Sequence, residues 1–159
     1  MDRAGGLSGI AVRRTAGDDA DALAIVAAMI AEIGGLYGGP PTAGSSATPE
    51  ELSPPGGGFV VLERGGRALA GGGVKRLSAA VCEIKRMYVV PAGRGQGLGT
   101  RLLEELEGLA RDLGYATARL DTGARQPGAQ RIYERAGYVA IPDYNGNPFA
   151  AWWGEKRLD

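Results

Sequence analysis

The sequence predicts an α+β fold, an α/β mixed sheet in one layer with helices packed against both of its faces. Two patterns of apolar residues, one typical of strands and one typical of helices, predict this class. Segments in which apolar residues alternate are interspersed with segments in which they recur every three or four positions, in the order β-α-α-β-β-β-α-β-α-β-β. The chain has 159 residues, of which 44% are hydrophobic, so it can bury a core of its own. We therefore expect a single domain over residues 1–159.

The first predicted elements are a strand and a long helix. The strand covers residues 9–14. The helix follows at Asp18 and Asp19, which can cap its N-terminus, and Gly34 and Gly35 are expected to end it. Its apolar residues recur at helical spacing: Leu23, Val26, Ala27, Ile30 and Ile33.

A loop, a second helix and a hairpin are predicted next. Residues 36–47 are rich in Gly, Pro and Ser and predict a loop. Residues 48–51 read Thr-Pro-Glu-Glu, a capping box with proline at the first helical position, and predict a short helix. Strands over residues 59–63 and 67–75 flank the turn at Gly65-Gly66 and form an antiparallel hairpin.

The C-terminal half is predicted to alternate strands and helices. Residues 81–90 are rich in β-branched and aromatic side chains and predict a long strand. Residues 97–113 carry leucines on one helical face, and Gly114 follows as the typical end of a helix. The remaining predicted elements are a strand over 116–121, a helix over 127–136 that begins with proline, and strands over 138–141 and 149–157.

Residue counts exclude several classes of function. Lys+Arg and Asp+Glu each number 18, which disfavours nucleic acid or a membrane surface as the partner. The chain has no histidine, which excludes Ser-His-Asp hydrolysis and His-ligated zinc. Its one cysteine, Cys82, can form neither an internal disulfide nor a Cys-rich metal site. No segment resembles a membrane span or a secretion signal. We therefore expect a cytoplasmic protein that uses no metal.

Residues 83–100 carry the strongest functional signal. A strand runs into a loop with glycines at alternate positions, and this loop opens the clearest predicted helix: the glycines are Gly93, Gly95, Gly97 and Gly99. Glycines allow a ligand to approach the backbone closely, and the first N–H groups of a helix favour an anion. The pattern predicts a diphosphate-binding loop, to which Arg94 can add a charged contact.

Two well-known phosphate loops fit this segment poorly. A Walker A loop needs a lysine before its final Ser or Thr, but here Gly99 directly precedes Thr100. A Rossmann fingerprint needs a third glycine where Thr100 stands, although Asp121 lies about 20 residues further on, as a ribose-binding acid would. A nucleotide-binding oxidoreductase is therefore kept only as an alternative.

A third type of phosphate-binding loop matches this segment better. Arg94-x-x-Gly97-x-Gly99, after a Val-x-Pro strand end, resembles the acyl-CoA loop of the Gcn5-related N-acetyltransferase (GNAT) superfamily. Residues 129–138 resemble the second motif of that family, and residues 142–158 resemble the tail of one bacterial branch. The resemblance covers about residues 9–158. It implies a GNAT-like fold, in which a central, mostly antiparallel sheet has helices on both faces and one central strand splays from its neighbour after a bulge.

The resemblance also implies an acetyl-CoA site beside the splayed strand. Free backbone groups of Met87 to Val89 would pair with the pantetheine arm, and the Met87 N–H would bind the oxyanion of the transferred acetyl group. Gln126 stands where many members carry an Asn that contacts the cofactor. The implied cofactor-binding residues are Met87, Tyr88, Val89, Arg94, Gly95, Gln96, Gly97, Leu98, Gly99, Thr100 and Gln126.

Two residues stand at the proton-transfer positions of the family. Glu83 stands where some members place a carboxylate base, and Tyr133 stands where many members place the tyrosine that returns a proton to the departing CoA thiolate. From the residues alone, Glu83 can equally be a solvated strand residue paired with Lys85 or Arg86, and Tyr133 can be a core aromatic. Without histidine, the acceptor ammonium must lose its proton to a carboxylate, a tyrosine, a backbone group or water.

The function that the resemblance implies is acetyl-CoA-dependent N-acetyltransfer directly to a primary amine. The partners would be acetyl-CoA and an amine acceptor, with a small or amino-acid-like amine favoured over a protein, and the family allows a homodimer. Residues 36–47 and 142–153 should build the acceptor pocket. A non-catalytic acyl-CoA-binding sensor on the same scaffold is the alternative from another functional class.

Overall fold

Within residues 7–37 and 47–159, which the computed structural model describes, the chain forms a seven-stranded sheet in the order β1-β2-β3-β4-β5-β7-β6. β4 and β5 run parallel, and the other neighbouring strands of this sheet are antiparallel. The strands are β1 (Ala11–Thr15), β2 (Gly58–Arg64), β3 (Arg67–Arg76), β4 (Val81–Val89), β5 (Thr117–Thr122), β6 (Val139–Ala140) and β7 (Trp152–Arg157).

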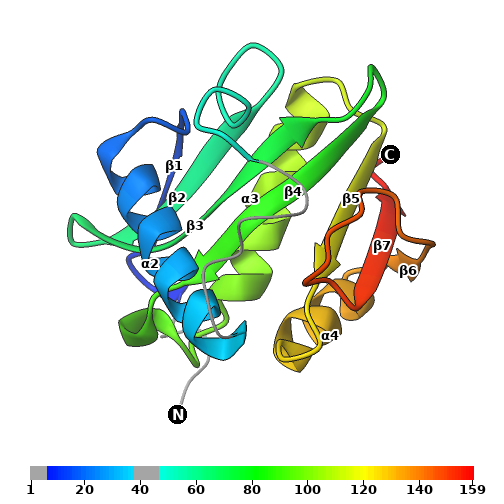
Figure 1. The fold of residues 1–159 in the computed structure, drawn as a ribbon. Coiled ribbons are helices and arrows are strands. Elements are labelled where there is room, and N and C mark those ends of the chain that lie inside the picture. The colour runs from blue at the N-terminus through cyan, green and yellow to red at the C-terminus, as the bar shows by residue number, and fades with distance from the viewer. Residues whose placement is uncertain (1–6, 38–46) are drawn as a thin grey trace.

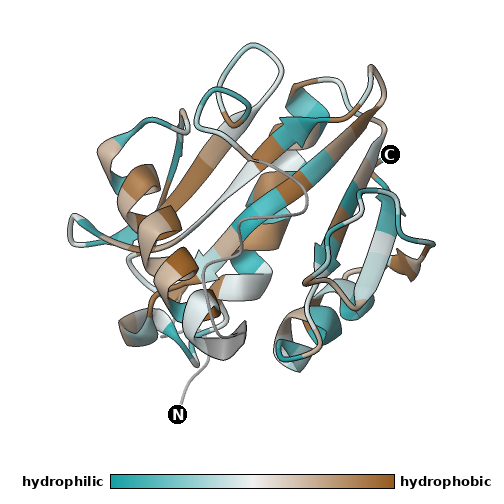
Figure 2. Ribbon diagram, in the orientation of Figure 1, coloured by the Kyte–Doolittle hydropathy of each residue, from teal (hydrophilic) through white to brown (hydrophobic). Residues whose placement is uncertain are grey.

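Helices cover both faces of the sheet (Figure 1). On one face, Ile25 and Met29 of the first helix pack with Phe59 of β2 in a buried cluster. On the other face, the two later helices contribute Leu106 and Tyr133 to a second cluster. Figure 2 shows apolar residues along β2, α2 and α3, whereas α4 is largely hydrophilic. The helices are α2 (Ala20–Tyr37), α3 (Leu98–Asp112) and α4 (Pro127–Arg135), with a short 3₁₀ turn, η1 (Pro91–Gly93), after β4.

The predicted fold class is confirmed by this arrangement and most element boundaries agree with it. All strands, and the helices α3 and α4, begin and end within three residues of their predicted bounds. The agreement follows from local signals. The leucines of α3 form one apolar stripe that packs on the sheet. Gly114 follows the end of the helix with a positive φ of 95°, which glycine adopts readily.

α2 differs from its prediction at its end and in its buried face. The helix continues through Gly34 and Gly35 to Tyr37, because two interior glycines cost only about 1 kcal/mol each and Ile33 just before them packs against the buried cluster. Leu23 is 46% exposed, so the stripe that faces the sheet is offset from the predicted one. Residues 38–46 of the predicted loop lie outside the described residues. None of the described helices is both long and apolar enough to span a bilayer.

The predicted second helix is a turn instead. The capping-box hydrogen bonds do form, since the Thr48 N–H donates to Glu51 Oε1 (3.0 Å) and the Glu51 N–H donates to Thr48 Oγ1 (3.2 Å). Two prolines and three glycines follow from residue 54 onward, so the segment cannot extend into a regular helix. The turn instead buries Leu52, which is 2% exposed, in the cluster beneath α2.

Candidate active site

β4 separates from its parallel neighbour β5 partway along its length (Figure 1). The two strands pair only at Val81, Cys82 and Glu83 of β4, although β4 continues to Val89. β5 pairs along its whole length with β7 on its other side. Beyond Glu83, the backbone of β4 therefore has no partner on the β5 side among the described strands, as the resemblance implied.

A β-bulge bends β4 at the same point. The β3–β4 register shifts between Gly71 and Gly73, so that Arg86 and Met87 together lie opposite Gly72. Arg86 has a φ of 61°, a left-handed conformation that is uncommon for a residue with a side chain. Bulges of this kind bend a strand and re-aim its side chains. The expected bulge is thus present, and it falls on Arg86.

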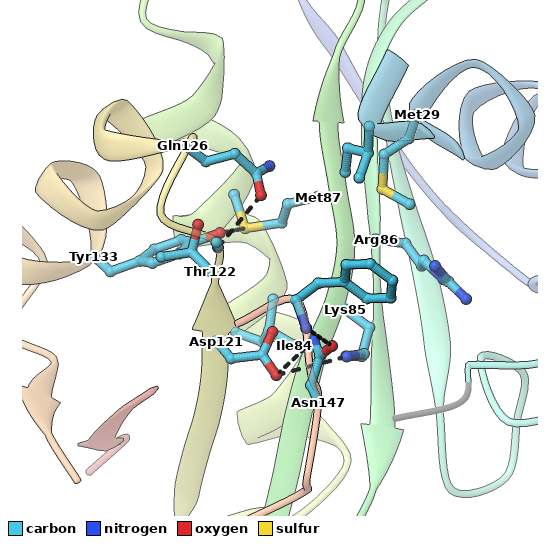
Figure 3. Close-up of a pocket in the computed structure, with 13 residues that line it drawn as sticks. Met29, Ile84, Lys85, Arg86, Met87, Asp121, Thr122, Gln126, Tyr133 and Asn147 are labelled. Atoms are coloured by element: carbon cyan, nitrogen blue, oxygen red, sulfur yellow. Dashed lines mark hydrogen bonds and ion pairs between the residues drawn. The ribbon is translucent and has the colours of Figure 1, made fainter. Parts of the chain in front are cut away.

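A cavity of about 130 Å³ lies beside the separated strands (Figure 3). Its walls come from the bulge of β4, the end of β5 and the turn after it, the start of α4, the later part of α2, and the loop before β7. The cavity therefore lies where β4 and β5 diverge and is lined by several segments that are far apart in the sequence. The polar and titratable side chains on its wall include Lys85, Arg86, Asp121, Gln126, Tyr133 and Asn147.

Tyr133 lies both on this cavity and in the core. Its ring is 7% exposed and stacks on Trp152, with 6.4 Å between ring centroids. Its hydroxyl lies 3.8 Å from the sulfur of Met87, a long and weak hydrogen bond. Burial raises the pKa of the Tyr133 hydroxyl, which therefore holds its proton at neutral pH. A buried phenol of this kind can donate a proton toward the part of the cavity next to Met87.

Glu83 is buried, which makes the solvated alternative wrong. Its side chain is fully inaccessible, and Oε2 accepts hydrogen bonds from the Tyr144 hydroxyl (2.6 Å) and the Asn145 amide (2.9 Å). Lys85 Nζ approaches the other oxygen, Oε1, at 4.0 Å. Lys85 and Asp121 line the cavity, whereas Glu83 lies behind them. An amine in the cavity therefore reaches Asp121 more directly than it reaches Glu83.

A polar loop before β7 completes the site. It lies within residues 142–153, which were expected to help build the acceptor pocket, but sequence reasoning did not predict its contacts with the two carboxylates. The Asn145 amide nitrogen donates to Asp121 Oδ2 (2.6 Å) as well as to Glu83, so one side chain bridges the two carboxylates. The Asn145 oxygen accepts from the Trp153 indole N–H (3.0 Å), while Trp152 faces the core. The available signals were the Asn-rich loop and the position of Asp121 at a strand end, but neither says which residues meet.

The glycines of the predicted phosphate loop divide into two kinds. Gly95 and Gly97 have φ of 78° and 80°, and a Cβ on either would meet no atom within 4 Å. Gly97 caps the N-terminus of α3, so the first free N–H groups of this helix follow it. A Cβ on Gly99 would lie 3.1 Å from Ile132 Cδ1, so Gly99 allows α3 to pack closely on α4. Gly95 and Gly97 therefore suit the approach of an anion, and Gly99 serves packing.

The side chains of Arg94 and Gln96 brace this loop. The Arg94 guanidinium donates to Glu32 of α2 (2.7 Å) and to the Val89 carbonyl (3.1 Å), and it lies 5.6 Å from the centre of the Tyr88 ring. Gln96 Nε2 donates to the Ala92 carbonyl. These contacts hold the loop backbone in place, and they engage the Arg94 charge that was expected to face a diphosphate.

The other predicted cofactor-binding residues lie along the same path. Met87 and Gln126 line the cavity with Tyr133. Tyr88 and Leu98 point their side chains into the core, so only their backbone groups are available to a ligand. Thr100 is exposed in the first turn of α3. The structure thus brings Met87, Gln126 and Tyr133 to one cavity and puts residues 94–100 at the end of β4.

Comparison with known proteins gives one consistent result. A model of the acetyltransferase (GNAT) family matches residues 32–138. The uncharacterized N-acetyltransferase YjgM of Escherichia coli (strain K12) is 36% identical over 87 residues, which are 53% of this chain and about half (52%) of that protein. A crystal structure from Klebsiella pneumoniae, described as a candidate acyl-CoA N-acyltransferase, has a TM-score of 0.78 at 29% identity and covers 94% of this chain and 98% of that one. The structure of yncA from Salmonella typhimurium with its cofactor acetyl-CoA shares the fold at 20% identity, with a TM-score of 0.66 and coverage of 96% and 95%.

Proposed function

The chain belongs to the acetyltransferase (GNAT) family, and on this premise we propose that it transfers the acetyl group of acetyl-CoA directly to a primary amine. The observation that carries the proposal is the separation of β4 from β5 after Glu83, with a cavity beside Met87. An unpaired strand backbone binds an extended molecule as a further strand would. The pantetheine arm of CoA, with its two amide groups, is such a molecule.

The residues around the divergence suit each part of that cosubstrate. The N–H groups at the start of α3, after the left-handed Gly95 and Gly97, would bind the diphosphate. The backbone of Met87 to Val89 would bind the pantetheine amides, and the Met87 N–H would hold the acetyl carbonyl oxygen and its developing negative charge. Gln126 lines the same cavity and offers a polar side chain to the cosubstrate.

Proton transfers are assigned to Tyr133 and to a buried carboxylate. Acetyl-CoA supplies an activated thioester when bound, so the chain has to position the amine, accept its proton and protonate the thiolate. Tyr133 keeps its proton at neutral pH and stands next to Met87, which suits donation to the thiolate sulfur. Glu83 is the proposed base, and Asp121, which lines the cavity and is bridged to Glu83 by Asn145, is the nearer carboxylate.

The test measures thiol release from acetyl-CoA on addition of a panel of primary amines, with binding of CoA and NADH followed by calorimetry. Cys82 is the only cysteine, and burial raises the pKa of its thiol to about 12, so the thiol reagent reports released CoA and not the folded protein. We expect CoA to bind, NADH not to bind, and at least one amine to be acetylated, as confirmed by mass spectrometry. Binding of CoA without turnover of any amine would favour the acyl-CoA sensor, and binding of NADH would favour the oxidoreductase.

A further inference from the structure

Arg86 occupies the bulge in a conformation that side chains rarely adopt. Its φ of 61° belongs to the left-handed region, where glycine and asparagine are the common residues. Neither has the reach or the charge of arginine. Strained residues of this kind persist where the surrounding structure holds them, and they cluster at functional sites. The bulge thus holds an arginine in a backbone position that favours a smaller residue.

The guanidinium of Arg86 lines the cavity without a partner among the described residues. Its Nε is buried and makes no hydrogen bond within residues 7–37 and 47–159. The carboxylate of Glu83 acts on this charge through space, without an ion pair between the two residues. Because the guanidinium is partly removed from water, burial lowers its pKa. A positive charge in such a place is stabilised when an anion binds beside it.

Other charged groups on the cavity wall are already engaged. Asp121 accepts hydrogen bonds from Asn145 and Asn147 and lies 4.0 Å from Lys85 Nζ. The apolar residues of the wall include Met29 and Ile33 of α2 and Phe149 of the loop before β7. In Figure 3, Arg86 and Met29 lie on one side of the view and Tyr133 and Gln126 on the other. The wall therefore offers one unpaired cation next to an apolar surface, on the side away from Tyr133.

We infer that Arg86 binds the carboxylate of the acceptor, so that the acceptor is a small amine carrying a carboxylate, such as an α-amino acid with an apolar side chain. The guanidinium presents two parallel N–H donors that match a carboxylate. Arg86 directly precedes Met87, so a carboxylate held by Arg86 leaves the amine a short distance away, toward the acetyl carbonyl at the Met87 N–H. Met29, Ile33 and Phe149 would contact the apolar side chain. This inference rests on the proposed function and names its substrate class.

The test compares matched acceptors that differ by one carboxylate. Leucine, methionine and phenylalanine are each paired with the amine left after decarboxylation: isoamylamine, 3-(methylthio)propylamine and phenethylamine. CoA release gives kcat and KM for each acceptor, and calorimetry gives its affinity for the protein saturated with CoA. We expect at least one amino acid to bind and to react, with a KM at least tenfold below that of its paired amine.

Substitution of Arg86 separates binding of the carboxylate from a structural role. Asparagine tolerates the left-handed region, so Arg86→Asn keeps the bulge while it removes the guanidinium. We expect it to raise KM for the amino acid by between about tenfold and a hundredfold, and to leave KM for acetyl-CoA and for the paired amine unchanged. Arg86→Lys keeps the charge without the paired donors and should give an intermediate KM. Arg67→Asn, at an exposed position beside the β2–β3 turn, removes the same charge elsewhere and should change nothing.

The outcomes distinguish this inference from the function it rests on. Equal KM values for an amino acid and its paired amine, an unchanged KM in Arg86→Asn, or neither binding nor turnover of any amino acid would each overturn the role of Arg86. In those cases, turnover of the carboxylate-free amines would leave the N-acetyltransferase intact. Failure of the protein to bind CoA would instead remove the proposed function.

Discussion

Tyr144 donates a 2.6 Å hydrogen bond to Glu83, a residue 61 positions away in the sequence, and so ties the loop before β7 to the buried carboxylate on β4. Burial and the negative charge of Glu83 both raise the pKa of the Tyr144 hydroxyl, so it remains a donor at neutral pH. The Arg119 guanidinium lies over the ring of Tyr144, 5.3 Å from the ring centre. The loop over the site is therefore anchored through a charged hydrogen bond.

Removal of this hydroxyl should destabilise the protein. Tyr144→Phe keeps the ring and loses a hydrogen bond to a charged group, so we expect the free energy of unfolding to fall by about 1.5–3 kcal/mol in urea denaturation. The control is a double-mutant cycle with Glu83→Gln, in which the effect of Tyr144→Phe should shrink because the charge it binds is absent. Additive effects of the two substitutions would show that this hydrogen bond contributes nothing specific.

Gly97→Val should weaken CoA binding by at least tenfold, or about 1.4 kcal/mol. Valine disfavours the φ of 80° at this position and puts a branched side chain where a ligand must approach the backbone. Calorimetry with CoA measures the change. Gly65→Val is the matched control, because Gly65 also has a positive φ and open space around it but lies in the β2–β3 turn. It should lower stability and leave CoA affinity unchanged. Equal CoA affinity in folded Gly97→Val and wild type would contradict the cofactor assignment.

Glu83→Gln should lower the acetylation rate by about 10²–10⁴, the usual loss when a positioned general base is removed. Part of the rate should return at higher pH, where more of the amine is already neutral. Asp121→Asn is the informative comparison, since Asp121 lines the cavity and Glu83 lies behind it. If only Asp121→Asn changes the pH–rate profile, then Asp121 is the base and Glu83 positions the loop through Asn145.

Tyr133→Phe should lower kcat by about 10²-fold, near 2.7 kcal/mol, with little change in CoA affinity. Because the hydroxyl makes only a long contact to the Met87 sulfur, the melting temperature should also change little. The substitution should lower kcat less for acyl donors with a more acidic thiol, because their thiolates leave without a proton. A kcat within twofold of wild type, together with weaker CoA binding, would mean that Tyr133 only lines the site and does not act as the general acid.

Alkaline pH should destabilise the protein through three tyrosines that are wholly or partly shielded from water. Burial raises the pKa of Tyr133, Tyr138 and Tyr144 above the value of about 10 that tyrosine has in an unfolded chain. Above pH 10 the unfolded chain releases these protons while the folded protein retains them. The contribution of these tyrosines to the free energy of unfolding is therefore fully present below pH 10 and is lost as the pH rises. Each such tyrosine contributes about 1.4 kcal/mol per pH unit in that window. Urea unfolding between pH 8 and 11 measures the slope, which should be smaller in Tyr144→Phe.

The sequence was sufficient for those features that depend on neighbouring residues. Gly97 and the leucine stripe of α3 lie in one segment, and the turn at Gly65-Gly66 defines its own hairpin, so both could be predicted. Tyr133 and the predicted phosphate loop could be proposed as site residues because both lie in short segments that resemble family motifs. The order of the strands then puts Tyr133 on the cavity beside Met87 and residues 94–100 at the end of β4.

Features that depend on distant contacts could not be predicted. The bridge of Asn145 between Glu83 and Asp121 joins three separate segments, and no local pattern encodes it. Gly34 lies inside α2, because contacts with the sheet outweigh a local tendency to stop. The orientation of Arg86 depends on the register shift opposite Gly72, which becomes visible only once β3 and β4 are paired.

The separation of β4 from β5 also bears on aggregation between copies of this molecule. An unpaired strand edge on a protein surface recruits other strands and leads to aggregation. Here the unpaired edge lies within the sheet, with Tyr133 on one flank and the loop that carries Asn147 and Phe149 on another. A strand of a second protein would have to pass these flanking residues to pair with the edge. The residues that line the cavity thus also flank the unpaired backbone edge of β4, which lies in the interior of the sheet and not at its rim.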